Sequence, residues 1–144
     1  MALTKDSFWQ FSLSVYPKWQ TELLQWQYKH KANVNLALLC LYLDQLDRQL
    51  ATHQIRELHL QVQTFSRQFT QLVRQCRRTM KQSQTLLNEY EAIRQHLLDA
   101  ELILERQEQG ELLAKLNPDA IEAVNSTPAT NWQRYQQLLQ MGQV

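Results

Sequence analysis

The stretch VNLALLCLYL, residues 34–43, is apolar at every position except Asn35, and it decides how the chain can fold. Asn33 stands directly before it and is a favoured residue at a helix N-terminus, so we expect a helix to begin there. The apolar positions cover nearly the whole circumference of this helix, and such a helix must be surrounded by other helices. The run is also too short to span a membrane, which takes about twenty apolar residues. We therefore predict that it forms the centre of a helical core.

The composition favours helices around this centre. The chain has 144 residues, which suits one domain with one core, and 44% of them are hydrophobic. It is rich in glutamine and has only two glycines and three prolines, so residues that end helices are rare. We predict an all-α fold, a single-domain bundle of five or six helices with a long antiparallel helical hairpin.

Aromatic residues crowd the segment before the central helix, beginning with FWQFSLSVY at residues 8–16. Thr4 or Asp6 is expected to cap a first helix over about residues 6–16, and Pro17 is expected to end it and to start a second helix. Two short helices can cover the central helix only with large side chains. We expect this layer to consist of Phe8, Trp9, Phe11, Val15, Trp19 and Trp26, with a small-ligand pocket among them as the alternative.

Two long helices are predicted after the central one. Thr52 is expected to cap the first, and a break near Ser83 separates it from the second, in which Gly110 is a plausible bend. Each carries apolar residues at spacings of 3 and 4, which is the pattern of a seam between paired helices. The first seam comprises Ile55, Leu58, Val62, Phe65, Phe69, Leu72, Cys76 and Met80, and the second Leu86, Tyr90, Ile93, Leu97, Ala100 and Leu104.

The charges of these two helices support their pairing. Residues 52–82 carry six basic residues and one acidic residue, a net charge of +5, whereas residues 83–111 carry two basic and seven acidic residues, a net charge of −5. Opposite charges favour neighbouring positions, although each exposed pair contributes only about 0 to 1 kcal/mol. We predict that residues 52–116 form an antiparallel hairpin.

The end of the chain is predicted to be a linker followed by an amphipathic helix. We divide the chain into a helical domain at residues 1–126, with an N-terminal three-helix part at 4–50 and the hairpin, and a terminal segment at 127–144. The terminal helix is too short to be stable alone and must dock, either on its own domain or in the groove of a partner. The candidate partner-binding residues are Trp132, Tyr135, Leu138 and Leu139.

Signs of catalysis or of a metal site are missing from the sequence. Two glycines cannot build a phosphate-binding loop, and none of the four histidines belongs to an HExxH or Glu-x-x-His pattern. We expect no catalytic residue, no metal site and no cofactor. Cys40 and Cys76 have no CxxC partner, so they are interpreted as buried free thiols. Asp44 and Asp47, with His53 nearby, are interpreted as the end of the central helix where it reaches water.

A basic stripe follows the first long helix, and it comprises Arg67, Arg74, Arg78 and Lys81. A linear row of cations can follow a phosphate backbone, which makes RNA or another anionic partner a candidate ligand. A solvated face balanced by the acidic helix is the other interpretation. No aromatic or asparagine side chain interleaves the arginines to contact bases.

The opening FWQFSLSVY together with VNLALLCLYL resembles a family of small, uncharacterised, all-helical proteins of proteobacteria, which has an FW-x-FSL-x-VY opening and a VN-x-x-L-x-C helix. The resemblance is clearest over residues 8–50 and implies an α fold and a bacterial cytoplasm without implying an active site. It is carried by Phe8, Trp9, Phe11, Ser12, Leu13, Val15, Tyr16, Val34, Asn35 and Cys40, of which Asn35 is predicted to make a hydrogen bond at the helix end.

These patterns together favour a non-catalytic cytoplasmic protein-interaction or adaptor module. No basic and apolar leader opens the sequence, so we expect no secretion and no membrane insertion. The expected partner is another protein, which the sequence does not identify. Binding of RNA or another anion along the basic stripe is the alternative, and small-ligand binding or an undetected enzyme has less support.

Overall fold

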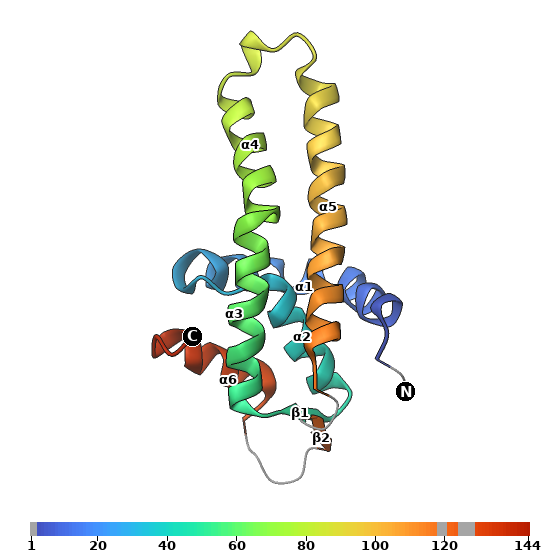
Figure 1. Ribbon diagram of the computed structural model, residues 1–144, viewed down its shortest axis with the longest axis vertical. Coiled ribbons are helices and arrows are strands. Elements are labelled where there is room, and N and C mark those ends of the chain that lie inside the picture. The colour runs from blue at the N-terminus through green and yellow to red at the C-terminus, as the bar shows by residue number, and fades with distance from the viewer. Residues whose placement is uncertain (1–2, 118–120, 124–128) are drawn as a thin grey trace.

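A computed structural model describes residues 3–117, 121–123 and 129–144, and it confirms a single all-α domain (Figure 1). The described residues form six α-helices and, in addition, a short two-stranded antiparallel ladder that the sequence did not predict. The elements are α1 (Lys5–His30), α2 (Val34–Gln45), β1 (Arg48–Leu50), α3 (Thr52–Gln68), α4 (Thr70–Gln82), the 3₁₀ turn η1 (Gln84–Leu86), α5 (Tyr90–Lys115), β2 (Ile121–Ala123) and α6 (Asn131–Gln140).

Helix α2 lies at the centre of the core, as predicted. The Asn33 side chain caps it by accepting a hydrogen bond from the backbone N–H of Leu36. Helices α1, α3, α5 and α6 all pack against α2, and most of its residues are buried. Because α2 is apolar on nearly all sides, it is stable at the centre, where other helices cover each of those sides.

The aromatic residues of α1 enclose α2 as expected. Phe8 and Phe11 are buried and stack on Tyr42 of α2, with ring centroids 5.9 and 4.6 Å away. Val15, Trp19 and Trp26 are partly buried against the same core, whereas Trp9 lies under the guanidinium group of Arg106. The predicted packing layer is therefore confirmed except for Trp9, which contacts α5 instead.

The prediction of two helices in this segment was wrong, because α1 continues through Pro17. A proline inside a helix removes one backbone hydrogen bond and costs about 3 kcal/mol. Pro17 is exposed, and so is Leu13, whose carbonyl oxygen loses its partner but stays within reach of water. Buried side chains on both sides of the proline, Phe8 and Phe11 before it and Leu23 after it, hold the two halves on the core.

Helices α3 and α4 run upward in Figure 1 and α5 returns beside them, so the predicted antiparallel hairpin is confirmed. Ala51 rather than Thr52 occupies the N-cap position, with no side-chain hydrogen bond. A distorted turn at Phe69 divides the predicted single helix into α3 and α4. Helix α5 runs unbroken through Gly110, and the glycine instead makes room for the Lys5 side chain, because a Cβ atom there would lie 2.9 Å from Lys5 Cε.

Helix α6 packs against α2 and α3, on the same core as the rest of the chain. Thr130 caps it with a capping box in which Gln133 takes part. The ladder below the core pairs β1 with β2 in antiparallel register, with Leu50 opposite Ile121. These strands are three residues long, too short for alternation of apolar and polar residues to reveal them. Within the stretch NSTPAT, residues 125–130, which was predicted to be the linker, residues 125–128 lie outside the described residues.

Candidate functional site

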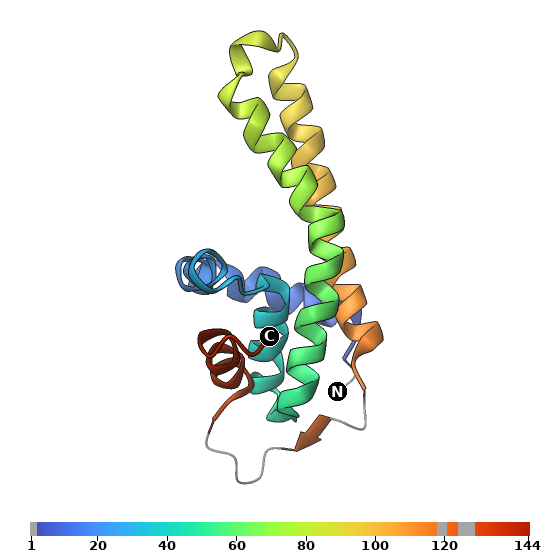
Figure 2. The same cartoon turned by 60° about the vertical axis from the view of Figure 1, so that its left-hand side comes forward.

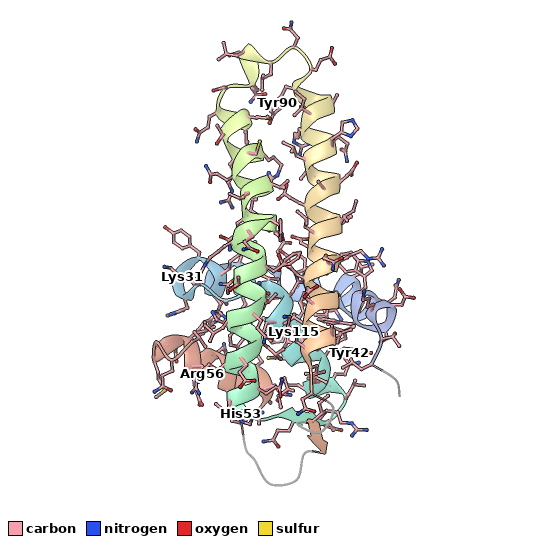
Figure 3. All side chains as sticks on the ribbon, viewed as in Figure 1. Lys31, Tyr42, His53, Arg56, Tyr90 and Lys115 are labelled. Atoms are coloured by element: carbon pink, nitrogen blue, oxygen red, sulfur yellow. The ribbon has the colours of Figure 1, made fainter. Side chains whose placement is uncertain are left out.

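The hairpin extends well beyond the rest of the domain. We call residues 70–105, which comprise α4, η1 and the first part of α5, the distal hairpin. In Figures 1 and 2 it projects away from α1, α2 and α6, and Figure 3 labels Tyr90 at its far end and Lys115 at the base of α5. No residue from 71 to 100 is buried. The distal hairpin is therefore a pair of helices that lacks a core of its own.

Ion pairs join the two helices of the distal hairpin, as the charge segregation predicted. Glu101 accepts hydrogen bonds from Arg77 and from Arg74, whose Nε lies 3.4 Å from its Oε1. Arg74 also contacts Glu105, with Nη2 3.4 Å from Oε1. The hydrogen bond to Glu101 raises the pKa of Arg77, and burial raises the pKa of Glu105 against the attraction of Arg74. Basic α4 is thus held on acidic α5 by specific contacts.

The basic stripe is divided by these contacts. Arg74 points toward α5 and is paired there, whereas Arg67, Arg78 and Lys81 are exposed. Only three of the four predicted cations are therefore solvated, because Arg74 is paired with Glu101 and Glu105 of α5. Binding of an anionic partner along this row stays a prediction.

The apolar seam predicted for α4 does not face α5. The side that faces α5 carries Thr70, which is buried, and the half-buried Val73 and Arg77. Each step along an α-helix turns by about 100°. Phe69, Leu72 and Cys76 each precede one of these residues, so they lie on an adjacent side of the helix.

On α5 the same displacement occurs. Glu101 and the half-buried Leu97 and Leu104 face α4, and the residues one step before them are His96, Ala100 and Ile103. Because the two helices are antiparallel, one step back along each chain turns toward the same side of the hairpin. We call the resulting surface the outer face, and define it by Phe69, Leu72, Cys76, His96, Ala100 and Ile103.

Five of the six residues of the outer face are apolar, with His96 as the exception, and all except the half-buried Ala100 are exposed. Leu72 is 63% exposed, Ile103 68% and Phe69 47%. Cys76 is exposed as well, so the prediction of a buried thiol was wrong for this residue and confirmed only for Cys40. None of the six defining residues is Asp, Glu, Lys or Arg. Large apolar side chains exposed together on one side of a helix pair are typical of an interaction site.

The body of the domain lies on the opposite side of the hairpin. Asp6 contacts Arg106, with Oδ1 3.8 Å from Nη2, and Ser12 accepts a hydrogen bond from Gln109. Asn35 donates a hydrogen bond to the backbone oxygen of Glu105. Glu105 lies one step after Leu104, which faces α4, so it is displaced toward the reverse side of the hairpin. The outer face is consequently left uncovered, as the bare side of the hairpin in Figure 2 shows.

A buried polar cluster fastens the hairpin to this body. Glu108 Oε1 accepts hydrogen bonds of 3.2 Å from the side-chain amides of both Asn33 and Asn35, and Gln109 donates one to Asn35. Gln63 donates a hydrogen bond to the Lys31 carbonyl oxygen. Asn35 was predicted to make a hydrogen bond at the end of its own helix, but its side chain instead donates hydrogen bonds to Glu105 and Glu108 of α5. The second oxygen of Glu108 and the amide oxygen of Gln109 lack a hydrogen-bond partner.

A second polar cluster anchors the N-terminal end of α6. The Asp44 carboxylate accepts hydrogen bonds from the backbone N–H groups of Asn131 and Trp132, at 2.8 and 3.2 Å. The Asn131 side chain bridges β1, accepting from the N–H of Leu50 and donating to the carbonyl of Arg48. Asp44 was interpreted as the point where α2 reaches water, but it also caps the start of α6. Burial raises the pKa of its carboxyl group despite these hydrogen bonds.

Tyr135 connects α6 to both α2 and α3. Its hydroxyl oxygen accepts a hydrogen bond of 2.9 Å from the N–H of Asn33 and lies 2.6 Å from Nδ1 of His59. A neutral imidazole protonated at Nε2 can accept at Nδ1, and the hydroxyl then donates to His59 while it accepts from Asn33. Burial and the nearby charge of Arg67 lower the pKa of His59 to about 4, which agrees with this assignment.

The candidate partner-binding residues of the terminal helix lie inside the core. Trp132, Tyr135, Leu138 and Leu139 are all buried, and Trp132 packs edge-on against Trp26. Of the two docking outcomes, the structure shows docking on the chain's own domain. A partner could reach these side chains only if α6 left the domain.

Neither a membrane span nor a metal site emerges from the described structure. Among the described residues no helix is both long and apolar enough to cross a bilayer. Within the same residues, no group of three or more His, Cys, Asp or Glu side chains is placed to bind a metal ion.

The geometry defines an all-α protein with a compact body and a projecting, charge-segregated hairpin. A family model described as a protein of unknown function, DUF2390, matches residues 7–112. That match covers α1 to most of α5, and the chain belongs to this family. No curated protein and no solved structure matches the chain significantly.

Proposed function

We propose that this protein is a non-catalytic interaction module that binds a protein partner through the outer face of its distal hairpin. The observation that carries the proposal is the exposed apolar surface on two helices that bury no residue from 71 to 100. Helices gain most of their stability from packing an apolar face rather than from local propensity. A second layer of helices on the outer face supplies the packing that the chain itself leaves out.

The other candidate surfaces are less suited to binding a partner. The N-terminal aromatic residues pack on α2, and the terminal helix is occupied by its own core. Exposed cations of the basic stripe lie beside acidic α5, which weakens their attraction for a polyanion. The two buried polar clusters hold helices together, and their members already bond one another. The outer face is therefore the surface best suited to a partner.

Photo-crosslinking in cells tests this function. A photoreactive phenylalanine analogue replaces Leu72 in one variant and Leu60 in the other, since Leu60 is 53% exposed on α3 but lies outside the outer face. We expect position 72 to yield discrete crosslinked protein species and position 60 to yield none of them. No species specific to position 72 would refute an interaction through this surface.

The identity of the crosslinked species separates the kinds of partner. Mass spectrometry of each band distinguishes a second copy of this chain from another protein. Either result supports an interaction module. Nucleic acid recovered in place of protein, at position 72, would favour the anionic alternative.

A further inference from the structure

Asn33 joins four helices at one point of the core. Its side-chain oxygen caps α2, and its side-chain amide donates hydrogen bonds to Glu108 of α5 and to Gln63 of α3, at 3.2 and 3.4 Å. Its backbone N–H donates to the hydroxyl oxygen of Tyr135 on α6, at 2.9 Å. Asn33 is buried, so these partners take the place of water. The contacts of α5 and of α6 therefore meet in a single residue.

We propose that Asn33 couples the docking of α6 to the attachment of the hairpin, so that release of α6 loosens the base of α5, residues 105–112. This inference goes beyond the proposed function and does not depend on what binds the outer face. In one direction, loss of the α6 contact weakens the hydrogen bond between Asn33 and Glu108. The reverse holds as well, because a coupling free energy between two sites is reciprocal.

The connection between α1 and α2 is the element that moves. Lys31 has φ 59° and ψ 34°, a left-handed conformation that is unfavourable for a residue with a Cβ atom. Such strain persists only while the surrounding contacts hold the backbone in place. Gln63 holds it through the carbonyl oxygen of Lys31, at 2.9 Å, and Tyr135 holds it through the N–H of Asn33. Without Tyr135 this N–H is a buried donor with no partner, which favours a rotation of the connection toward water.

Glu108 is sensitive to such a rotation. Its Oε1 accepts hydrogen bonds from the side-chain amides of Asn33 and Asn35, and its Oε2 is buried without a hydrogen-bond partner. Among the residues that the structure describes, no basic side chain forms an ion pair with Glu108. A buried carboxylate depends on the few donors that it has. The attachment of α5 at this point therefore depends on where Asn33 lies.

Helix α5 passes the change on to the distal hairpin. It is unbroken from Tyr90 to Lys115, so Glu108 in its base and Glu101 beside α4 belong to one continuous helix. In Figure 1 this helix runs from the core to the far end of the hairpin. A looser attachment at Glu108 consequently gives the distal hairpin more freedom to tilt against the body of the domain.

Double-mutant cycles measured by urea unfolding test the coupling. Tyr135→Phe removes the hydroxyl that holds Asn33, and Glu108→Leu removes the acceptor of the Asn33 side chain. We expect the two losses to be less than additive, with an unfolding equilibrium constant of the double variant that departs from the additive value at least about fivefold. The control cycle combines Glu108→Leu with Asp44→Ala, because Asp44 holds the start of α6 from the other end of α2, and there we expect additivity within about twofold.

Amide hydrogen exchange of the full chain gives a second readout that needs no change in the hairpin. Asp44→Ala loosens α6 at its first turn. The amides of α6 and of residues 105–112 are compared with those in the middle of α2, which report global unfolding. We expect α6 and the base of α5 to lose protection by the same factor relative to α2. Tyr28→Phe, at an exposed position of α1, is the matched control and is expected to change neither.

Three results would overturn the inference. The first is additivity within about twofold in the cycle of Tyr135→Phe and Glu108→Leu. The second is a control cycle with Asp44→Ala that shows the same coupling, which would mean that the effect does not pass through Asn33. The third is faster exchange of α6 alone in Asp44→Ala, with wild-type protection of residues 105–112. All three concern the isolated chain, so they leave the proposed function of the outer face untouched.

Discussion

Replacing Tyr135 by Phe removes a single oxygen atom from the most deeply connected side chain of α6. Tyr135 is fully buried, and its hydroxyl joins the N–H of Asn33 to Nδ1 of His59. The ring of Phe keeps the apolar contacts with Trp132, so packing changes little. The substitution therefore isolates the two hydrogen bonds that tie α6 to α2 and α3.

The expected loss follows from the groups that are left behind. A buried donor or acceptor without a partner costs about 1 to 3 kcal/mol. Two such groups, the Asn33 N–H and the His59 Nδ1, predict a decrease of about 3 kcal/mol in the free energy of unfolding, with some relief where the imidazole turns. For a chain of this size 1 kcal/mol corresponds to a change of roughly 3 °C in Tm, so the expected decrease is about 10 °C.

Thermal and urea unfolding followed by circular dichroism measure this loss. Tyr28→Phe is the matched control, because Tyr28 is 88% exposed on α1, and its Tm is expected to stay within about 1 °C of the wild type. A change of less than about 0.5 kcal/mol for Tyr135→Phe would refute the reasoning. It would mean that the hydroxyl does not satisfy these two buried groups.

Three further perturbations probe the polar contacts of the fold. Because the pKa of His59 is about 4 in the folded chain and about 6.5 unfolded, the unfolded chain binds more protons between these values, and stability falls by at most about 1.4 kcal/mol per unit as the pH decreases through this window. The raised pKa values of Asp44 and Glu105 oppose part of this decrease, and in His59→Asn the pH dependence measured by urea unfolding is expected to flatten or reverse. A double-mutant cycle of Arg77→Gln and Glu101→Gln is expected to give a coupling free energy of about 1 kcal/mol, since Glu101 is nearly buried, and strict additivity would contradict their pairing. Asp44→Ala removes the acceptor of two N–H groups at the start of α6, and a decrease of about 1 to 2 kcal/mol in unfolding free energy is expected, whereas no change would deny it a capping role.

The parts of the fold that local patterns encode could be predicted. The apolar run at 34–43 indicated a buried central helix, and the opposite charges of residues 52–82 and 83–111 indicated their pairing. The first signal lies within three helical turns, and the second is a composition difference between two segments that are adjacent in the sequence. Fold class and hairpin topology followed from them.

The errors arise where contacts distant in the sequence decide the outcome. A proline normally ends a helix, but the burial of Phe8 and Leu23 in the core holds α1 together across Pro17. The hydrogen bond between Asn33 and Glu108 joins residues 75 positions apart, and no local spacing announces it. Such contacts become visible only once the helices are placed in space.

The predicted seam shows a different limit. Spacings of 3 and 4 identify a face of α4 that suits burial, but they do not say what covers it. Leu72 and Cys76 belong to that seam and are exposed in the folded chain. The spacing therefore identified residues of the outer face, but the sequence analysis wrongly predicted that these residues pack against α5.

Amide hydrogen exchange tests most directly whether the outer face binds a protein partner. It would be measured for the wild type and for Leu72→Glu, each purified alone and each in extract of its own cells, with α2 as the internal reference. We predict that protection across residues 70–105 of the wild type rises in the extract, that it does not rise in Leu72→Glu, and that α2 is equally protected throughout. Protection of residues 70–105 that is the same in both conditions and in both proteins would contradict a hairpin covered by a partner.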